Sequence, residues 1–461
     1  MIHTSKYFFT VSAMFNKDKE KTPDNRSSSP YLSENDPEDP QILNPTISNT
    51  NAPPPVFDPD TFNPPDGGFR AWSQVFAVIL INALAWGYPA SFGVYQLHYE
   101  ESLGLPSSQI SWIGSCQTFL TFAFCAPAGR LADAGYTRET VALGSFLAIL
   151  GTFTTSLCKQ YWQIFLAQGV CTGIGLALLF MPAVTVLGSY FKAKKAFALA
   201  LGATGTGLGS IIFPATLQYL IPQIGFPWAV RCAAFVALFM IVVANIMLKP
   251  YLPPRKTGPL MEWDAFKELP FVLFVLGAFL NFYALYFGFF YINVYARNVI
   301  GFSSVEAVSL LLVVNAMSIP ARPIMGYLAD NVLGPINTFI IGLFALSIML
   351  YCWIGVKTAA GMYVFCVFFG FANGACQGTF VGANASLTKD PRKMGTRFGM
   401  VQTISAFASL AGPPTAGAIL DTSNGNFTYA QIWGGTVFFF AAVVVTGSRI
   451  ASTGWVLLKK K

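Results

Sequence analysis

Arg322 has the chemistry to receive an anion, and its place in the sequence is far from either end of an apolar stretch. It precedes Asp330 by eight residues, which is about 12 Å along a helix. Asn315, Ser318 and Arg322 are spaced i, i+3 and i+7, so they form one polar stripe on a helix. Because a guanidinium offers a planar fork of donors that matches a carboxylate, the stripe predicts a binding site for a carboxylated solute.

A plainer interpretation of Arg322 stays open. Pro320 and Pro323 flank it, and a proline leaves a helix carbonyl without its usual amide partner. The guanidinium could bond such a carbonyl, or extend toward the membrane surface, without meeting any solute. An ionisable group inside a membrane costs about 2.5–3.5 kcal/mol or more, which favours the functional interpretation.

Other polar side chains in apolar stretches are weaker candidates for the same site. Asn82, Asn281, and the pair Asn373 and Gln377 are predicted to line a cavity. They would serve equally well as hydrogen-bonding groups between packed helices. The apolar stretches contain no nucleophile–base pair, paired acids or cluster of metal ligands. We therefore expect no enzyme activity, no cofactor and no metal site.

The composition tells us which elements must position these side chains. Of 461 residues, 54% are hydrophobic and 11% are charged, and the mean hydropathy is +0.53. Soluble domains average about 25% charged residues, so the chain is predicted to be an integral membrane protein. The net charge of +7 comes from short basic clusters between apolar runs, which argues against nucleic-acid binding. The eight cysteines lack CxxC spacing and are predicted to be packing residues without disulfides.

The apolar runs predict an all-α membrane protein of twelve transmembrane helices. A membrane helix needs about 20 mainly apolar residues. Twelve such runs occur, near 71–95, 110–131, 139–158, 161–187, 196–220, 228–248, 270–293, 304–328, 336–356, 360–386, 398–420 and 430–456. The segment 250–268 is mixed in charge and divides them into two six-helix halves, 66–249 and 269–461. Residues 1–65 are rich in Pro, Asn, Asp and Ser and are predicted to be a disordered cytosolic tail without a signal peptide.

Charges in the loops predict the orientation. With the N-terminus in the cytosol, nearly all loop Lys and Arg residues lie on the cytosolic side, and the other side keeps Lys159, Arg297 and Lys357. Both termini are therefore predicted to be cytosolic. The last outside loop also carries a glycosylation sequon at Asn426.

A short motif occurs once in each predicted half. Gly129 to Asp133 reads G-R-L-A-D, and Gly326 to Asp330, 197 residues later, reads G-Y-L-A-D. The Gly and the Asp share a helix face, so the Gly lets a neighbouring helix approach and the carboxylate can meet that helix's N-terminal amides. A plain helix-ending turn is the alternative. The repetition in register instead favours a gate at the cytosolic face.

This motif resembles the loop signature of the major facilitator superfamily, G-x-L-A-D followed by basic residues, here Arg138. Two further stretches resemble the monocarboxylate porter family within it, in a variant similar to its fungal branch. One stretch opens the first run and is similar to the family's D-G-G-aromatic-small-W, with Asp66, Gly67, Gly68, the extra residue Arg70, and Trp72. The other opens the fifth run and is similar to Y-F-x-K-R-R, with Tyr190, Phe191, Lys194 and Lys195. The resemblance, with G-P-P-T-A-G at 412–417, covers residues 65 to about 457.

The resemblance implies a solute carrier with a midplane cavity between two rocking halves, and G-x-L-A-D loops that close the cytosolic side. In the family an Arg before this motif binds the substrate carboxylate, and Arg322 matches it. Animal members carry an Asp one turn earlier, where this chain has Ser318, and a Lys after an aromatic–Pro pair, where it has Ala90. Lactate–proton symport is therefore not expected. We expect uniport, or a proton carried on the substrate, with Asp66 as the competing proton site.

The expected function is secondary transport of a small organic solute by alternating access. The solute is predicted to be a carboxylate or a carboxylated secondary metabolite, and uptake of a monocarboxylate or vitamin is the alternative. A non-transporting nutrient sensor is a more distant one. The expected partners are an anionic small molecule and the lipid bilayer, without nucleic acid. We expect a monomer in the plasma membrane, with the vacuolar membrane as the alternative location.

Overall fold

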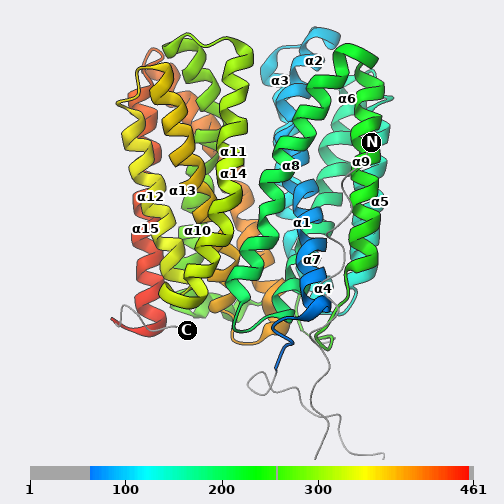
Figure 1. Ribbon diagram of the computed structural model, residues 1–461, viewed down its shortest axis with the longest axis vertical. Helices are drawn as coiled ribbons and strands as arrows, with labels where there is room; N and C mark the ends of the chain where they lie inside the picture. Colours follow the sequence, from blue (N-terminus) through cyan, green and yellow to red (C-terminus); the bar gives the residue numbers. More distant parts are fainter. Residues whose placement is uncertain (1–62, 256–257, 456–461) are drawn as a thin grey trace, which may run out of the picture. The chain divides into compact units, whose positions relative to one another are not determined.

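The computed structural model describes residues 63–255 and 258–455, in which helices are the regular secondary structure. These described residues belong to one compact unit. The predicted tail lies outside the described residues up to position 62, as do the C-terminal lysines. Figure 1 shows the helices standing side by side in two bundles, one for each half of the sequence.

The first bundle contains six helical rods, three of which are broken into shorter pieces. Pro127 explains one break, because a proline cannot donate to the carbonyl four residues earlier, here that of Ala123. The elements are α1 (Gly68–Ala90), α2 (Phe92–Leu103), α3 (Ser107–Ala123), α4 (Cys125–Asp133), α5 (Thr137–Thr155), α6 (Tyr161–Ile164), the π-helical η1 (Phe165–Thr172), α7 (Gly173–Tyr190), α8 (Lys195–Ile224) and α9 (Phe226–Met247).

The second bundle also contains six rods, after a connecting segment that includes the short 3₁₀ helix η2 (Trp263–Lys267). Ser303 and Glu306 cap the start of α11 reciprocally, which fixes where that rod begins. The elements are α10 (Leu269–Tyr295), η3 (Ala296–Ile300), α11 (Ser304–Leu328), η4 (Ala329–Leu333), α12 (Pro335–Trp353), α13 (Ala359–Ser386), the 3₁₀ helix η5 (Pro391–Lys393), α14 (Met394–Thr422) and α15 (Phe427–Thr453).

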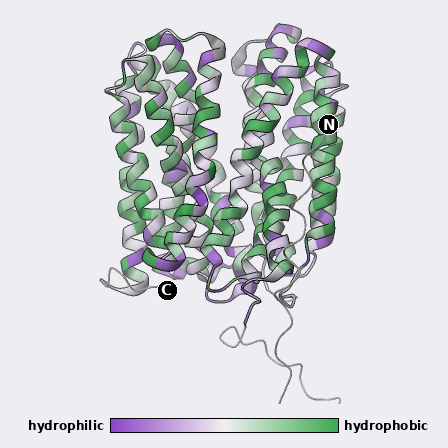
Figure 2. Ribbon diagram, viewed as in Figure 1, coloured by the Kyte–Doolittle hydropathy of each residue, from purple (hydrophilic) through white to green (hydrophobic). Residues whose placement is uncertain are grey.

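The expectation of twelve helices in an all-α membrane protein is confirmed. Within the described ranges, nine rods are long and apolar enough to cross a membrane, and the other three are α3–α4, α5 and α14. Figure 2 shows hydrophobic residues along most of the length of the helices. The first rod is longer than expected, because α2 continues it to Leu103 rather than ending near residue 95.

Two seams join the bundles, one between α8 and α11 and the other between α14 and α3–α4. Small residues make close packing possible next to the first seam. A Cβ atom at Gly205 or Gly209 of α8 would collide with backbone carbonyls of α1, those of Ile79 and Ala83. Glycine is therefore required where α1 and α8 meet, as in other close contacts between membrane helices.

Candidate functional site

The two G-x-L-A-D motifs lie at the same end of the molecule, which we call the basic end. There α4 and α7 end and α8 and α14 begin, at the bottom of Figure 1. Its loops carry the basic residues Lys192, Lys194, Lys389, Arg392 and Lys393. The two motifs therefore face the seams from opposite halves.

Asp133 caps the first turn of α14 across the second seam. Its carboxylate accepts hydrogen bonds from the Gly395 amide at 3.0 Å and from the Thr396 amide at 2.6 Å. The Thr396 hydroxyl adds a third bond at 2.6 Å. Asp133 is 5% exposed, so a nearly buried carboxylate satisfies the free amides and the positive end of a helix in the other half.

Asp330 makes the equivalent contact across the first seam. Its carboxylate accepts from the amides of Ala196 at 3.0 Å and Phe197 at 2.7 Å, in the first turn of α8. This carboxylate is half-buried. Each half thus contributes one acidic residue and one helix N-terminus, and the two contacts are related by the internal repeat.

The motif glycines allow these contacts to form. A Cβ atom at Gly129 would collide with the Gly395 carbonyl, and one at Gly326 would lie 2.6 Å from the Cβ of Ala200. The motif therefore needs glycine because a helix of the other half passes directly over it. Arg138 lies exposed on α5, outside these contacts.

Thr403 of α14 provides a third polar contact across the second seam, which we did not predict from sequence. Its hydroxyl donates to the Ala123 carbonyl at 2.9 Å, the carbonyl that Pro127 leaves without an amide. The same hydroxyl accepts from the Ala126 amide at 3.1 Å. The sequence signal for this contact is a proline in one helix and a hydroxyl residue in another. It can be recognised only when it is known that the two helices meet.

Arg322 lies at the first seam, in contact with the other half. Its Nη1 donates to the carbonyl oxygen of Ala203 in α8. Its side chain is 4% exposed, and its buried Nε has no partner in the described residues. None of the ion pairs found there includes Arg322. A buried guanidinium without a counter-ion is costly, which marks this position as one where an anion would be stabilised.

Asn82 of α1 bonds the same stretch of α8 as Arg322 does. The Asn82 amide donates at 3.1 Å to the carbonyl of Gly202, the residue before Ala203. The structure therefore brings together two of the predicted cavity residues, one from each half. Both side chains donate to backbone carbonyls of a neighbouring helix. This is the structural role considered above as the alternative to solute binding for each residue.

The other two residues of the stripe face the helices on either side of α11. Ser318 donates to the Asn315 carbonyl at 2.7 Å, and Asn315 donates to that of Leu311 at 2.9 Å. A Cβ atom at Gly207 of α8 would lie 3.1 Å from the Ser318 hydroxyl, and one at Gly374 of α13 would touch the Ser318 backbone. The stripe is therefore packed between α8 and α13.

Asn281, Asn373 and Gln377 form a second polar group in the second half. Gln377 Nε2 donates to Asn281 Oδ1 at 3.3 Å, joining α13 to α10. Asn281 Nδ2 and Asn373 Oδ1 are buried without a partner in the described residues. Gln377 precedes Gly378, whose Cβ position is 2.8 Å from Cγ of Arg322, so this group lies next to the stripe on α13.

The two further stretches that resemble family motifs contact each other. Asp66 accepts from the amides of Lys192 and Ala193, in the turn between α7 and α8. Trp72 packs edge-on against Phe191, with ring centroids 5.3 Å apart. Tyr190 donates to the Lys249 carbonyl at 2.9 Å, and Lys195 is held near Asp66. Gly67 and Gly68 form the turn into α1, and Lys194 precedes α8.

A charged cluster at the basic end was also missed by sequence reasoning. Glu262 of the connecting segment pairs with Lys393 and with Arg397, at 3.2 Å for the latter, and Arg397 also bonds Glu268 at 2.6 Å. Burial would raise the pKa of Glu262, but hydrogen bonds from Lys393 and Arg397 outweigh it and hold that pKa below its usual range. Arg130, inside the first motif, donates to the carbonyls of Arg255, Gly258 and Pro259.

Asn426 stands at the end of the bundle opposite the basic end, where it caps α15. Its Oδ1 accepts from the Thr428 amide at 3.0 Å, and the side chain is exposed. The eight cysteines are free thiols. Within the described ranges no group of His, Cys, Asp and Glu is arranged to hold a metal ion.

Two bundles of six rods, joined at one end by reciprocal carboxylate-to-helix contacts, are the architecture of a membrane transporter built from two related halves. The chain belongs to the Major Facilitator Superfamily, whose model matches residues 75–413. It is a multi-pass membrane protein and a secondary transporter of an organic solute.

Similar proteins agree with this assignment. An MFS-type transporter of Gibberella zeae is 35% identical over 393 residues, which cover 85% of this chain and 89% of the relative. The Aspyridones efflux protein apdF of Emericella nidulans is 34% identical over 391 residues, covering 84% and 79%. The human organic anion transporter MFSD10 (TETRAN) has the same fold, with a TM-score of 0.67 at 16% identity, covering 83% of this chain and 100% of that one.

Proposed function

We propose that this transporter carries an organic anion and that Arg322 receives its carboxylate. The observation that carries the proposal is the buried guanidinium at the first seam, whose Nε has no partner in the described residues. A bidentate carboxylate would supply the acceptors and the counter-charge that a single backbone carbonyl does not. Ser318, Asn315 and Asn82 flank it, and Asn281, Asn373 and Gln377 would bond the rest of the solute.

The two motif aspartates would act as gates at the basic end. The positive-inside rule supports a cytosolic position for the basic end, and with it for both termini. The contacts of Asp133 and Asp330 would then close the cytosolic side in an outward-facing state and break when the halves, 66–249 and 269–461, rock about the connecting segment 250–268. Gly129, Gly326 and Arg138 would belong to the same gates.

We favour export of a carboxylated secondary metabolite over uptake of a monocarboxylate or vitamin. The sequence resembles the fungal branch of the monocarboxylate porters but lacks the Lys and Asp of its animal members. A relative that covers most of the chain is named as an efflux protein for aspyridones. We propose a monomer in the plasma membrane, with the vacuolar membrane as the alternative.

Proton coupling would depend on the substrate rather than on a side chain. Asp66 is the competing proton site, and its carboxylate already accepts two backbone amides in the turn before α8. That geometry favours a structural role. We therefore propose uniport, or a proton that travels on the solute.

The experiment compares Arg322→Lys and Arg322→Ala with a matched variant, Arg231→Lys. Arg231 lies on α9, where it bonds Ser156 at 3.1 Å and packs over Trp228. An untargeted comparison of metabolites inside and outside cells, with and without the gene, first identifies the solute. In proteoliposomes Arg322→Lys should weaken transport about tenfold or more and Arg322→Ala should abolish it, while Arg231→Lys leaves it unchanged. Wild-type transport by Arg322→Ala would exclude the anion site.

A further inference from the structure

Six aromatic side chains from six different helices form a closed circuit across the space between the halves. We call them the aromatic cluster. The first half contributes three and the second half three: Trp86 of α1, Phe122 of α3, Phe180 of α7, Phe282 of α10, Phe380 of α13 and Phe398 of α14. None of the six was among the residues predicted from sequence to gate the pathway.

Each ring of the cluster contacts the next. Within the first half, Trp86 lies 4.9 Å from Phe122 and 5.3 Å from Phe180, measured between ring centroids. Within the second half, Phe380 lies 5.5 Å from Phe282 and 5.7 Å from Phe398. All these separations fall in the range in which tilted and edge-to-face aromatic pairs attract each other.

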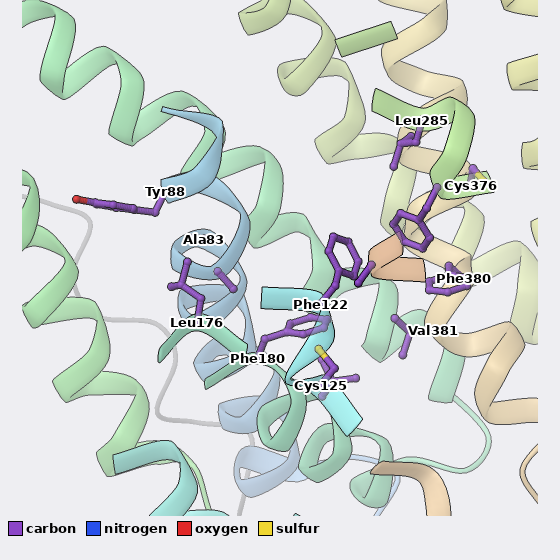
Figure 3. Packing of buried hydrophobic residues seen from close by; sticks show 14 of the residues in the cluster. Ala83, Tyr88, Phe122, Cys125, Leu176, Phe180, Leu285, Cys376, Phe380 and Val381 are labelled. Atoms are coloured by element: carbon purple, nitrogen blue, oxygen red, sulfur yellow. The ribbon is translucent and has the colours of Figure 1, made fainter. Parts of the chain in front are cut away.

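Two contacts close the circuit between the halves. Phe122 meets Phe282 edge-to-face at 5.1 Å, with an interplanar angle of 72°. Phe180 meets Phe398 at 6.3 Å. Figure 3 shows Phe122 and Phe180 on the side of the first half, and Phe380 facing them from the other side. The halves therefore cannot separate at this level without breaking both ring pairs.

The cluster begins where the Asp133 contact ends and extends away from the basic end. Phe398 is two residues beyond Thr396 in α14, whereas Phe122 precedes Asp133 by eleven residues, about 16 Å along a helix. Phe122 and Phe398 are completely buried. Cys125, also completely buried, lies about one turn from Phe122 toward the basic end (Figure 3).

The cluster is also next to the polar site at the first seam. Trp86 follows Asn82 by one helical turn, about 6 Å along α1. Phe380 follows Gln377 by three residues on α13, and both side chains meet α10, at Phe282 and Asn281 respectively. A solute that reached Asn82 or Gln377 would have these rings beside its apolar part.

We propose that the aromatic cluster is an inner gate, in series with the two aspartate gates, and that it selects solutes with a flat unsaturated body. The proposal rests on the proposed function, in which an organic anion crosses between the halves. When the halves separate, the Phe122–Phe282 and Phe180–Phe398 pairs lose their contacts. An aromatic solute restores ring–ring contacts during passage, whereas a saturated solute of the same size does not.

The gate is tested by alkylation of Cys125 with N-ethylmaleimide, read for that residue by peptide mass spectrometry. Phe282 belongs to the other half from Cys125, so Phe282→Ala leaves Cys125 and its own helix unaltered. The substitution should speed alkylation about two- to tenfold, the loss expected for one aromatic pair. The matched control is Phe274→Ala on the same helix, completely buried, whose ring contacts Phe380 and Phe339 within the second half.

A double-mutant cycle separates gating from general loosening. Phe122→Ala and Phe282→Ala should together have less effect than the product of their separate effects, because either one already breaks the pair. Independent effects, or an equal effect of Phe274→Ala, would overturn the gate.

Selectivity is tested with two acids of the same carbon skeleton, 2-naphthoate and decahydro-2-naphthoate, in proteoliposomes corrected for protein-free vesicles. We expect faster uptake of 2-naphthoate, a preference that falls at least threefold in Phe282→Ala and persists in Phe274→Ala. Equal uptake of the two acids, or no uptake of either, overturns the selectivity. Arg322→Lys should slow the uptake of both acids to the same extent. If Arg322→Lys takes up both acids at the wild-type rate while Phe282→Ala behaves as expected, the anion site is excluded and the aromatic gate is retained.

Discussion

The two aspartate contacts that we propose as gates come from one repeated motif, yet they are not equal. Asp133 accepts three hydrogen bonds, one of them from the Thr396 hydroxyl, and is 5% exposed. Asp330 accepts two amide bonds and is half-buried. The connecting segment also reaches the Asp133 gate, where the Arg255 amide donates to the Asp133 carbonyl at 2.7 Å.

This difference shows that a repeated sequence motif can preserve the geometry of a contact while the stability of that contact differs between the two copies. Both carboxylates cap a helix of the other half, which the motif itself requires. The extra bond and the extra burial at Asp133 come from residues outside the motif. We infer that the Asp133 gate contributes more to the closed state, and four substitutions can break or sharpen this comparison.

The largest effect is expected from Asp133→Asn. The amide keeps one acceptor oxygen but loses the charge that pairs with the N-terminus of α14, which should cost the closed state about 2–3 kcal/mol. Alkylation of Cys125 should then be about 30-fold faster or more, with transport reduced at matched expression. Asp264→Asn, an exposed acid of the connecting segment, is the control. Unchanged labelling and turnover would exclude the gate.

Asp330→Asn should have a smaller effect of the same kind. Its carboxylate has two amide partners and is partly screened by solvent, so we expect about 1–1.5 kcal/mol, or roughly tenfold faster labelling of Cys125. Because rocking of the halves opens both gates together, one reporter measures both. If Asp330→Asn accelerates Cys125 alkylation more than Asp133→Asn does, the Asp330 contact contributes more to the closed state and our inference is wrong.

Thr396→Val tests where the difference comes from. The substitution keeps the shape and the backbone amide but removes the hydroxyl bond to Asp133, at an expected cost of about 1 kcal/mol. In the Thr396→Val protein, Asp133→Asn and Asp330→Asn should differ less in their rates of Cys125 alkylation than they do without this substitution. Thr422→Val, whose hydroxyl bonds only its own helix, serves as the control. If the two alkylation rates differ as much as before, the greater strength of the Asp133 contact would be due to its burial alone.

The smallest effect is expected from Glu262→Gln, which weakens the charged cluster beside the Asp133 gate. Arg397 keeps Glu268 as a partner and Lys393 is partly exposed, so the loss should be about 0.5–1 kcal/mol of stability. The pKa of Glu262 is held below its usual range, so its contribution is present above the unfolded value of about 4.3 and is lost as the pH falls through the folded value. The melting temperatures of wild type and variant should therefore differ at pH 7 and converge below about pH 4. A difference that persists there would show that packing, not charge, is responsible.

Much of the fold followed from the sequence, because local patterns determine it. Apolar runs of membrane length predict rods whatever their neighbours are, and the repeated motif predicts two halves. Asp133 and Asp330 could be placed against helix N-termini since the motif combines a glycine for close approach with a carboxylate for the amides. In these cases the chemistry of the residue itself indicates what it must contact.

The rest depends on which helices meet, and a single sequence does not contain that information. The bond of Arg322 to Ala203, the Thr403 bond at the Pro127 break and the two ring pairs between the halves all join residues more than 100 positions apart. Phenylalanine in a membrane helix fits lipid as well as a gate, so composition could not single out the five cluster phenylalanines among 43. In the sequence Glu262 looks like an ordinary loop charge, because its partners Lys393 and Arg397 lie more than 100 positions away, at the start of α14.

The contact between the two family motifs has a consequence for how such transporters can be recombined. Asp66 and Trp72 bind the turn before α8 through Lys192, Ala193 and Phe191. The two stretches, more than 100 residues apart, therefore form one exchangeable module. A chimera that lacks Asp66 would lose the amide bonds, and one that lacks Trp72 or Phe191 would lose the ring contact, whereas one that inherits both stretches together would retain the junction.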